Sequence, residues 1–78
     1  MNKARREKIG TMISELESIR DRVEGLTSEE QESFDSMPEG LKTTQRGEDA
    51  EEAINNLELA FTEVESLIDL LELARGNG

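Results

Sequence analysis

Apolar residues recur at alternating intervals of three and four along two stretches of this chain. Side chains spaced in this way share one face of an α-helix, and such a face can be buried only against other helices. The two stretches are separated by a short segment that contains proline and glycine. The pattern therefore predicts an all-α fold, an antiparallel helical hairpin. The apolar positions are Ile9, Met12, Leu16, Ile19, Val23 and Leu26, then Ala50, Ala53, Leu57, Ala60, Val64, Leu67, Leu71 and Ala74.

The boundaries of the two helices follow from capping and turn residues. The first helix is predicted over residues 3–36; Gly25, followed by a possible capping box from Thr27 to Glu30, leaves a break near residue 25 as the alternative. Pro38 and Gly40 predict a reversal over residues 37–43. The second helix is predicted over residues 44–75, and the whole chain, 1–78, forms one domain.

The second helix carries more apolar surface than the first helix can cover. A lone hairpin would expose a leucine-rich strip near the C-terminal end, and we expect such a strip to be an interface. Closing into a four-helix bundle or a larger homo-oligomer would bury it. The predicted interface residues are Leu59, Phe61, Ile68, Leu70 and Leu73.

Charge and composition limit the classes of function. Nineteen acidic and nine basic residues give a net charge of -10, which opposes direct binding to nucleic acid or to an anionic membrane. The chain has no cysteine and no histidine, so thiolate and imidazole chemistry are excluded. We expect no catalytic residue, no metal and no cofactor. The lack of cysteine fits a reducing compartment, and we expect a cytoplasmic protein.

The segment between the helices is the least repetitive part of the chain and holds the candidate ligand-binding residues. The start of a helix offers backbone donors to an anion, and basic side chains beside it would strengthen binding. The alternative is structural: Phe34 closes the end of the hairpin, Thr44 caps the helix and Arg46 pairs with an acid. The candidates are Phe34, Lys42, Thr44, Gln45 and Arg46.

Clustered carboxylates flank this segment on both sides. Their spacing is too loose for a metal site of the kind that supports phosphate chemistry, and a solvated helix face accounts for them. A dense row of carboxylates can also imitate the charge of a nucleic acid and occupy a basic site on another protein. The residues are Glu29, Glu30 and Glu32, with Glu48, Asp49, Glu51 and Glu52.

The string SFDSMPEGLKTTQRGEDAEEAINNLE carries a resemblance. It resembles the core of a group of short acidic helical proteins of phages and mobile elements, which have Phe-Asp-x-Met-Pro-Glu-Gly-Leu and then Arg-Gly-Glu before a second helix. The resemblance covers residues 29–74, with residues 22–28 as an insertion of about one heptad. It implies a phage origin and therefore the cytoplasm of an infected bacterial host.

Together these features predict a non-enzymatic anti-defence protein. We expect it to form a homo-oligomer and to sequester a small, anionic, nucleotide-derived immune signal in a pocket between protomers. One alternative is an acidic nucleic-acid mimic that inhibits a basic host defence protein or nuclease. The other alternative is a structural or adaptor helical bundle.

Overall fold

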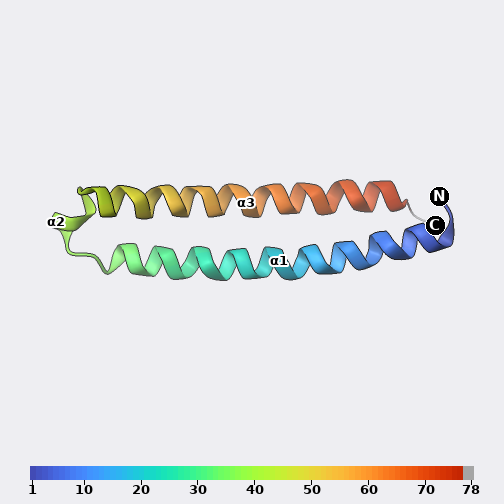
Figure 1. The fold of residues 1–78 in the computed structure, drawn as a ribbon, viewed down its shortest axis with the longest axis horizontal. Coiled ribbons are helices and arrows are strands. Elements are labelled where there is room, and N and C mark those ends of the chain that lie inside the picture. Colours follow the sequence, from blue (N-terminus) through green and yellow to red (C-terminus); the bar gives the residue numbers. More distant parts are fainter. Residues whose placement is uncertain (77–78) are drawn as a thin grey trace.

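The computed structural model describes residues 1–76 as an antiparallel helical hairpin (Figure 1). Its elements are α1 (Lys3–Asp35), α2 (Glu39–Lys42) and α3 (Gln45–Arg75), and the described residues contain no strand. Helices α1 and α3 lie side by side, α2 closes one end, and the N-terminus and the end of α3 lie at the other end. The molecule is a rod of 58 × 14 × 14 Å. The last two residues of the predicted domain, 77–78, lie outside the described residues.

Helix α1 runs through Gly25 without a break. The Thr27 hydroxyl donates a hydrogen bond to the Val23 carbonyl oxygen, 2.8 Å away, which is the geometry of a mid-helix threonine rather than of a capping box. The N-terminus of α1 is capped by Asn2, whose Oδ1 accepts from the Arg5 amide at 2.9 Å. The alternative prediction, a break in the helix near residue 25, is therefore wrong.

The segment predicted as a simple turn over residues 37–43 contains the one-turn helix α2. Its main chain packs on Gly47, the one buried glycine among the described residues. Thr44 is the N-cap of α3, yet its hydroxyl donates back to the Leu41 carbonyl and not forward, so it leaves the α3 amides without a side-chain cap. Helix α3 ends before Gly76, whose φ of 73° suits glycine.

The buried core is small and lies along the contact between α1 and α3. Among residues 1–76, only Ile13, Ile54 and Ile68 are buried apolar residues, with 5–6% of their surface exposed. Met12, Ile19 and Leu26, which the apolar pattern predicts in the contact, are instead 42–52% exposed. This corrects the predicted contact face: both helices are rotated so that the row containing Ile13 and the row containing Ile54 and Ile68 face inward.

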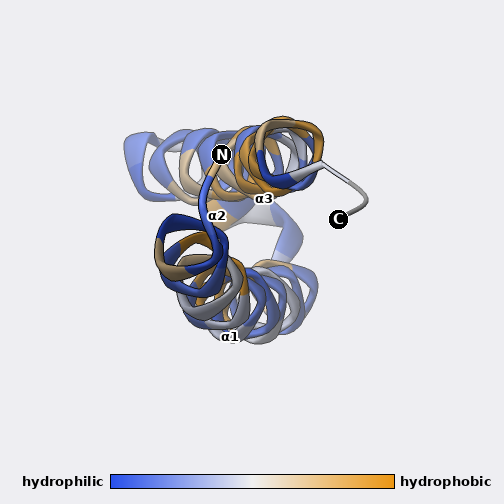
Figure 2. Cartoon of the chain, turned by 90° about the vertical axis from the view of Figure 1, so that its right-hand side faces the viewer, coloured by the Kyte–Doolittle hydropathy of each residue, from blue (hydrophilic) through white to orange (hydrophobic). Residues whose placement is uncertain are grey.

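The rotation has a simple energetic reason on α3. Two alternative rows flank the shared row of Leu57 and Val64: one carries Ile54, Phe61 and Ile68, and the other is mostly alanine. Burying apolar surface stabilises by about 25 cal/mol per Å², so the row of larger side chains gains more when only one can face α1. Figure 2 shows that apolar residues of α3 also continue around the helix, away from α1.

The rod exposes more surface than a globular protein of its size. Its accessible surface is 5702 Å² for 8.7 kDa, whereas about 4,700 Å² is typical of a folded monomer of that mass. Part of the excess comes from the elongated shape, and part from exposed leucines and isoleucines along both helices. In residues 1–76, no helix combines the length and apolar character that crossing a bilayer requires.

Candidate functional site

The structure brings two of the five predicted ligand-binding residues together at the α2 end. The Lys42 Nζ lies 5.3 Å from the centre of the Phe34 ring, a cation–π distance. The same ammonium lies 3.2 Å from Glu39 Oε1, an ion pair within α2. The charge of Lys42 is therefore already partly countered by its own helix.

The other three predicted residues lie on the exposed first turn of α3. The Thr44 hydroxyl bonds back to α2, and Gln45 Nε2 donates to Asp49 Oδ1 at 2.7 Å. Arg46 is exposed, and no ion pair involves it within the part of the chain that the structure describes. The five residues thus share one end of the rod, and among them Phe34 lines a hollow between α1 and α3 that is described below.

The predicted interface residues are divided between three environments. Ile68 is buried against α1 within a single chain, and Phe61 is partly buried where it lines a hollow between the helices. Leu59, Leu70 and Leu73 are exposed over 61–77% of their surface. In a seven-residue repeat with Leu57 and Val64 facing α1, the positions of Leu59 and Leu73 point directly away from α1.

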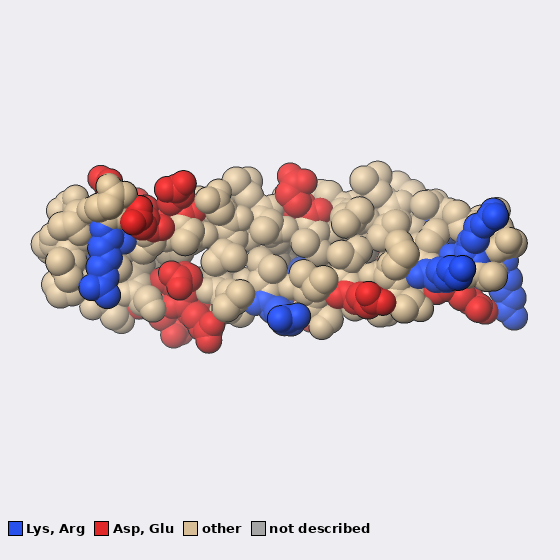
Figure 3. Space-filling view, in the orientation of Figure 1, with Lys and Arg blue, Asp and Glu red and all other residues tan. Residues whose placement is uncertain are grey.

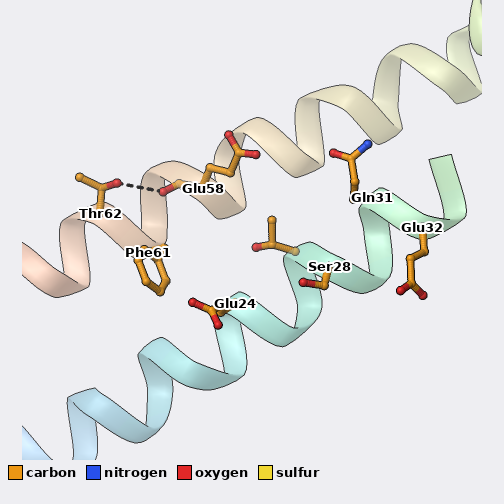
Figure 4. A pocket seen from close by; sticks show the side chains of 8 residues that line it. Glu24, Ser28, Gln31, Glu32, Glu58, Phe61 and Thr62 are labelled. Carbon is orange, nitrogen blue, oxygen red and sulfur yellow. Dashed lines mark hydrogen bonds between the residues drawn. The ribbon is translucent and has the colours of Figure 1, made fainter. Parts of the chain in front are cut away.

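A groove between α1 and α3 was not predicted from the sequence. Figure 4 shows Phe61 of α3 and Glu24 of α1 pointing toward one another across it. Its volume is about 560 Å³. A second hollow, toward α2, shares Gln31 and Glu58 with the first and adds Phe34, Glu51, Ile54 and Asn55. We call the two together the acidic groove; the first part is lined by Glu24, Thr27, Ser28, Gln31, Glu32, Glu58, Phe61 and Thr62.

The acidic groove combines apolar and anionic side chains. Phe34 and Phe61, the only aromatic residues of the chain, both line it. Four carboxylates also line it, from Glu24, Glu32, Glu51 and Glu58, and no lysine or arginine does. Such a groove suits the side chain of lysine or arginine, whose methylene groups pack on a ring while the charged end reaches carboxylates.

The groove exists because Thr27 lies opposite Phe61. Threonine is too small to fill the space beside the ring, and its hydroxyl already bonds within α1. The sequence contains this signal, a small residue at the inward position between Ile13 and Phe34. Thr27 can be recognised as an inward residue only once the faces that α1 and α3 turn toward each other are known, and the apolar pattern predicted different faces.

The wider charge distribution agrees with a cationic partner. Residues 21–58 carry twelve acidic and three basic side chains, whereas the rest of the chain carries seven acidic and six basic ones. On the face shown in Figure 3, basic residues gather at the terminal end, and carboxylates gather toward the α2 end beside one basic column. The α2 half therefore attracts cations most strongly.

Within residues 1–76, no cluster of three or more carboxylate, histidine or cysteine side chains is placed to hold a metal ion. No protein-family model, curated protein or solved structure matches this chain. A proposal for the function therefore has to be argued from the residues of the groove and of the α2 end.

Proposed function

We propose that this protein is a non-enzymatic binding protein that acts as a homo-oligomer of hairpins and holds a basic segment of a host protein in its acidic groove. The resemblance to phage and mobile-element proteins makes a host defence protein the favoured target. One observation supports the proposal above all. Both phenylalanines of the chain lie among four carboxylates in a groove that no basic residue lines.

The contact between Lys42 and Phe34 supports the proposal as an intramolecular template for a basic side chain on a ring. In that contact an ammonium lies over a ring and beside a carboxylate. An arginine or lysine of the partner, placed on Phe61 between Glu24 and Glu58, would repeat the arrangement. A cation–π contact contributes about 0.5–2 kcal/mol and an exposed ion pair about 0.2–1 kcal/mol. Several basic residues must therefore bind along the groove together, and the acidic α2 half would speed their association.

A short arginine-rich peptide is the probe for this proposal, with a glutamate-rich peptide of equal length as its control. We expect saturable binding of the first peptide alone, and weaker binding as salt is raised. Phe61→Ala and Glu24→Gln should each reduce the affinity, whereas Glu72→Gln, which removes one charge outside the groove, should have little effect. Equal losses for Glu24→Gln and Glu72→Gln, with no loss for Phe61→Ala, measured by calorimetry, would indicate attraction by net charge alone and reject the groove.

A second candidate function is capture of a small anionic, nucleotide-like ligand at the start of α3. It is supported by the exposed Arg46 and by the amides of a 31-residue helix that no side chain caps. Arg46→Ala should then abolish nucleotide binding, and Arg46→Lys should restore it only in part, because an ammonium lacks the planar fork of the guanidinium. In the groove proposal Arg46→Ala leaves peptide binding unchanged or stronger, whereas charge reversal at Glu51 weakens it.

A further inference from the structure

Half of the apolar pattern of α1, and a quarter of that of α3, remains exposed in the single hairpin. Met12, Ile19 and Leu26 recur every seven residues on α1 and are all exposed. The corresponding row on α3 contains Leu67, which is 44% exposed, and three alanines. We call these two rows the uncovered face; on α3 the row consists of the half-buried Ala53 and Ala60 and the exposed Leu67 and Ala74.

Both rows lie on the same side of the hairpin. In a seven-residue repeat, each row is displaced by about 80° from the inward direction of its helix. The displacement has the same sense in both helices, viewed along the chain. Because the chain reverses between α1 and α3, the two rows then point to one common side. The acidic groove, formed by positions displaced in the opposite sense, opens on the other side.

The register of the hairpin pairs the two rows along the rod. Gly10 lies against the guanidinium of Arg75, Thr27 lines the groove with Phe61, and Phe34 lines it with Ile54. The same register places Met12 level with Ala74, Ile19 with Leu67 and Leu26 with Ala60. The uncovered face is therefore an apolar surface that extends over about 20 Å of α1 and about 30 Å of α3.

We infer that a second copy of this chain covers the uncovered face, giving a four-helix bundle whose two acidic grooves lie on its outer sides. The inference rests on the proposed homo-oligomer and specifies its interface. In such a bundle the rows that alternate by three and four residues point to the common centre, so the whole apolar pattern is buried. The two rows cover only part of the 58 Å length of the rod, so flanking residues on either side of them must complete an interface of standard size, about 800 Å² per partner.

Two symmetric arrangements of the hairpins are possible, and the flanking charges distinguish them. With both α2 ends together, α1 packs on α3 of the second copy. Arg22 then lies beside Glu63 of the second copy, twice per dimer, and Leu26 packs on an alanine of the opposing α3. With α2 ends opposed and the two-fold axis level with Arg22, near the middle of the rod, Arg22 lies beside Arg22 and Glu63 beside Glu63. The local pairs therefore favour the arrangement with the α2 ends together.

Long-range repulsion opposes this choice, because it brings two acidic α2 halves together. Most of those carboxylates occupy heptad positions that face away from the second copy, and salt at physiological concentration screens interactions beyond about 8 Å. The pair of Arg22 and Glu63 lies at the interface and is not screened in this way. The flanking pairs consequently decide the orientation.

Sedimentation equilibrium tests the interface. Leu26→Glu should raise the dimer dissociation constant by about 100-fold or more, because symmetry places the change at the interface twice. Leu59→Glu, the same change on a residue that is also exposed in the hairpin but points away from α1, should leave the constant within about threefold. A wild-type monomer at high concentration, or an equal response to both changes, would overturn the inference. Peptide binding by a monomer would leave the groove proposal intact.

The relative orientation of the two hairpins can be tested with a substitution that should not destabilise the fold. The chain has no cysteine, and a side chain at Gly40 meets nothing within 4 Å. Spin labels on Gly40→Cys should lie within about 30 Å of each other if the α2 ends meet, since neighbouring helix axes are about 8–10 Å apart. Opposed ends would separate them by about 50 Å, from about 1.5 Å of rise per residue.

A charge exchange provides the independent check on orientation. Arg22→Glu and Glu63→Arg should each weaken the dimer by about 3- to 10-fold, and the double variant should recover wild-type affinity. With opposed ends, like charges face each other in every variant. The two changes would then show no coupling, and the proposed orientation would be wrong.

Discussion

The main chain of Lys42 rests directly on Gly47. A Cβ added to Gly47 would fall well inside van der Waals contact of the Lys42 carbonyl and Cα atoms. Since the obstacle is main chain, no side-chain rotation can relieve it. This contact fixes where α2 ends against α3, and it gives the glycine of the Arg-Gly-Glu sequence a structural role.

Gly47→Ala should destabilise the protein by about 1–3 kcal/mol, because the hairpin end must shift to admit a methyl group. Gly40→Ala is the matched control, since the same addition there meets open space. Thermal unfolding at one fixed protein concentration measures both variants. A Gly47→Ala protein as stable as the wild type would show that α2 does not pack as described.

Gly25→Ala should have the opposite effect. Gly25 lies inside the continuous helix α1, and a methyl group added there would meet nothing within 4 Å. Alanine in a helix interior is more favourable than glycine by about 0.5–1 kcal/mol, so the melting temperature should rise. A decrease would instead indicate that the chain needs a bend at this position.

The observed rotation of α3 predicts a contrast between two aliphatic residues. Ile68 is 6% exposed and Leu73 is 77% exposed. Ile68→Ala should cost about 2–5 kcal/mol, whereas Leu73→Ala should stay within about 0.5 kcal/mol. Urea unfolding compares the two free energies. If both substitutions cost the same free energy, Leu73 must be buried in an interface. The uncovered face would then not be the main interface between copies.

The cap of α1 predicts a pair of changes at one position. Asn2 accepts a hydrogen bond from the Arg5 amide, and the first turn of α1 has no acidic residue. Asn2→Ala should destabilise by about 0.5–2 kcal/mol, whereas Asn2→Asp should stabilise slightly through the helix dipole. Helicity measured by circular dichroism near the melting midpoint should rank the variants in that order, and a reversed order would contradict the capping role.

Periodicity was sufficient to predict the two helices and the reversal between them. The row between residues 13 and 34 was not predicted as the inward one, because Arg20 and Thr27 interrupt it. A side chain such as Arg20 can still pack there through its methylene groups while its guanidinium reaches Asp21 at 3.2 Å. The acidic groove depends on which residue of α1 lies level with Phe61. The position of α1 relative to α3 along the rod is set by α2 and by its contact with Gly47. The spacing of apolar residues within each helix carries no information about that position.

The single reversal at α2 also has a consequence for local unfolding. Contacts near α2 close short loops of chain, whereas the contact between Gly10 and Arg75 closes nearly the whole sequence. Separation of the helices should therefore begin at the open end, where fraying breaks few contacts, and stop before the α2 half. Amide hydrogen exchange would be fastest around the termini. The acidic groove, between Glu24 and Phe34 on α1, would remain formed in molecules whose ends have already separated.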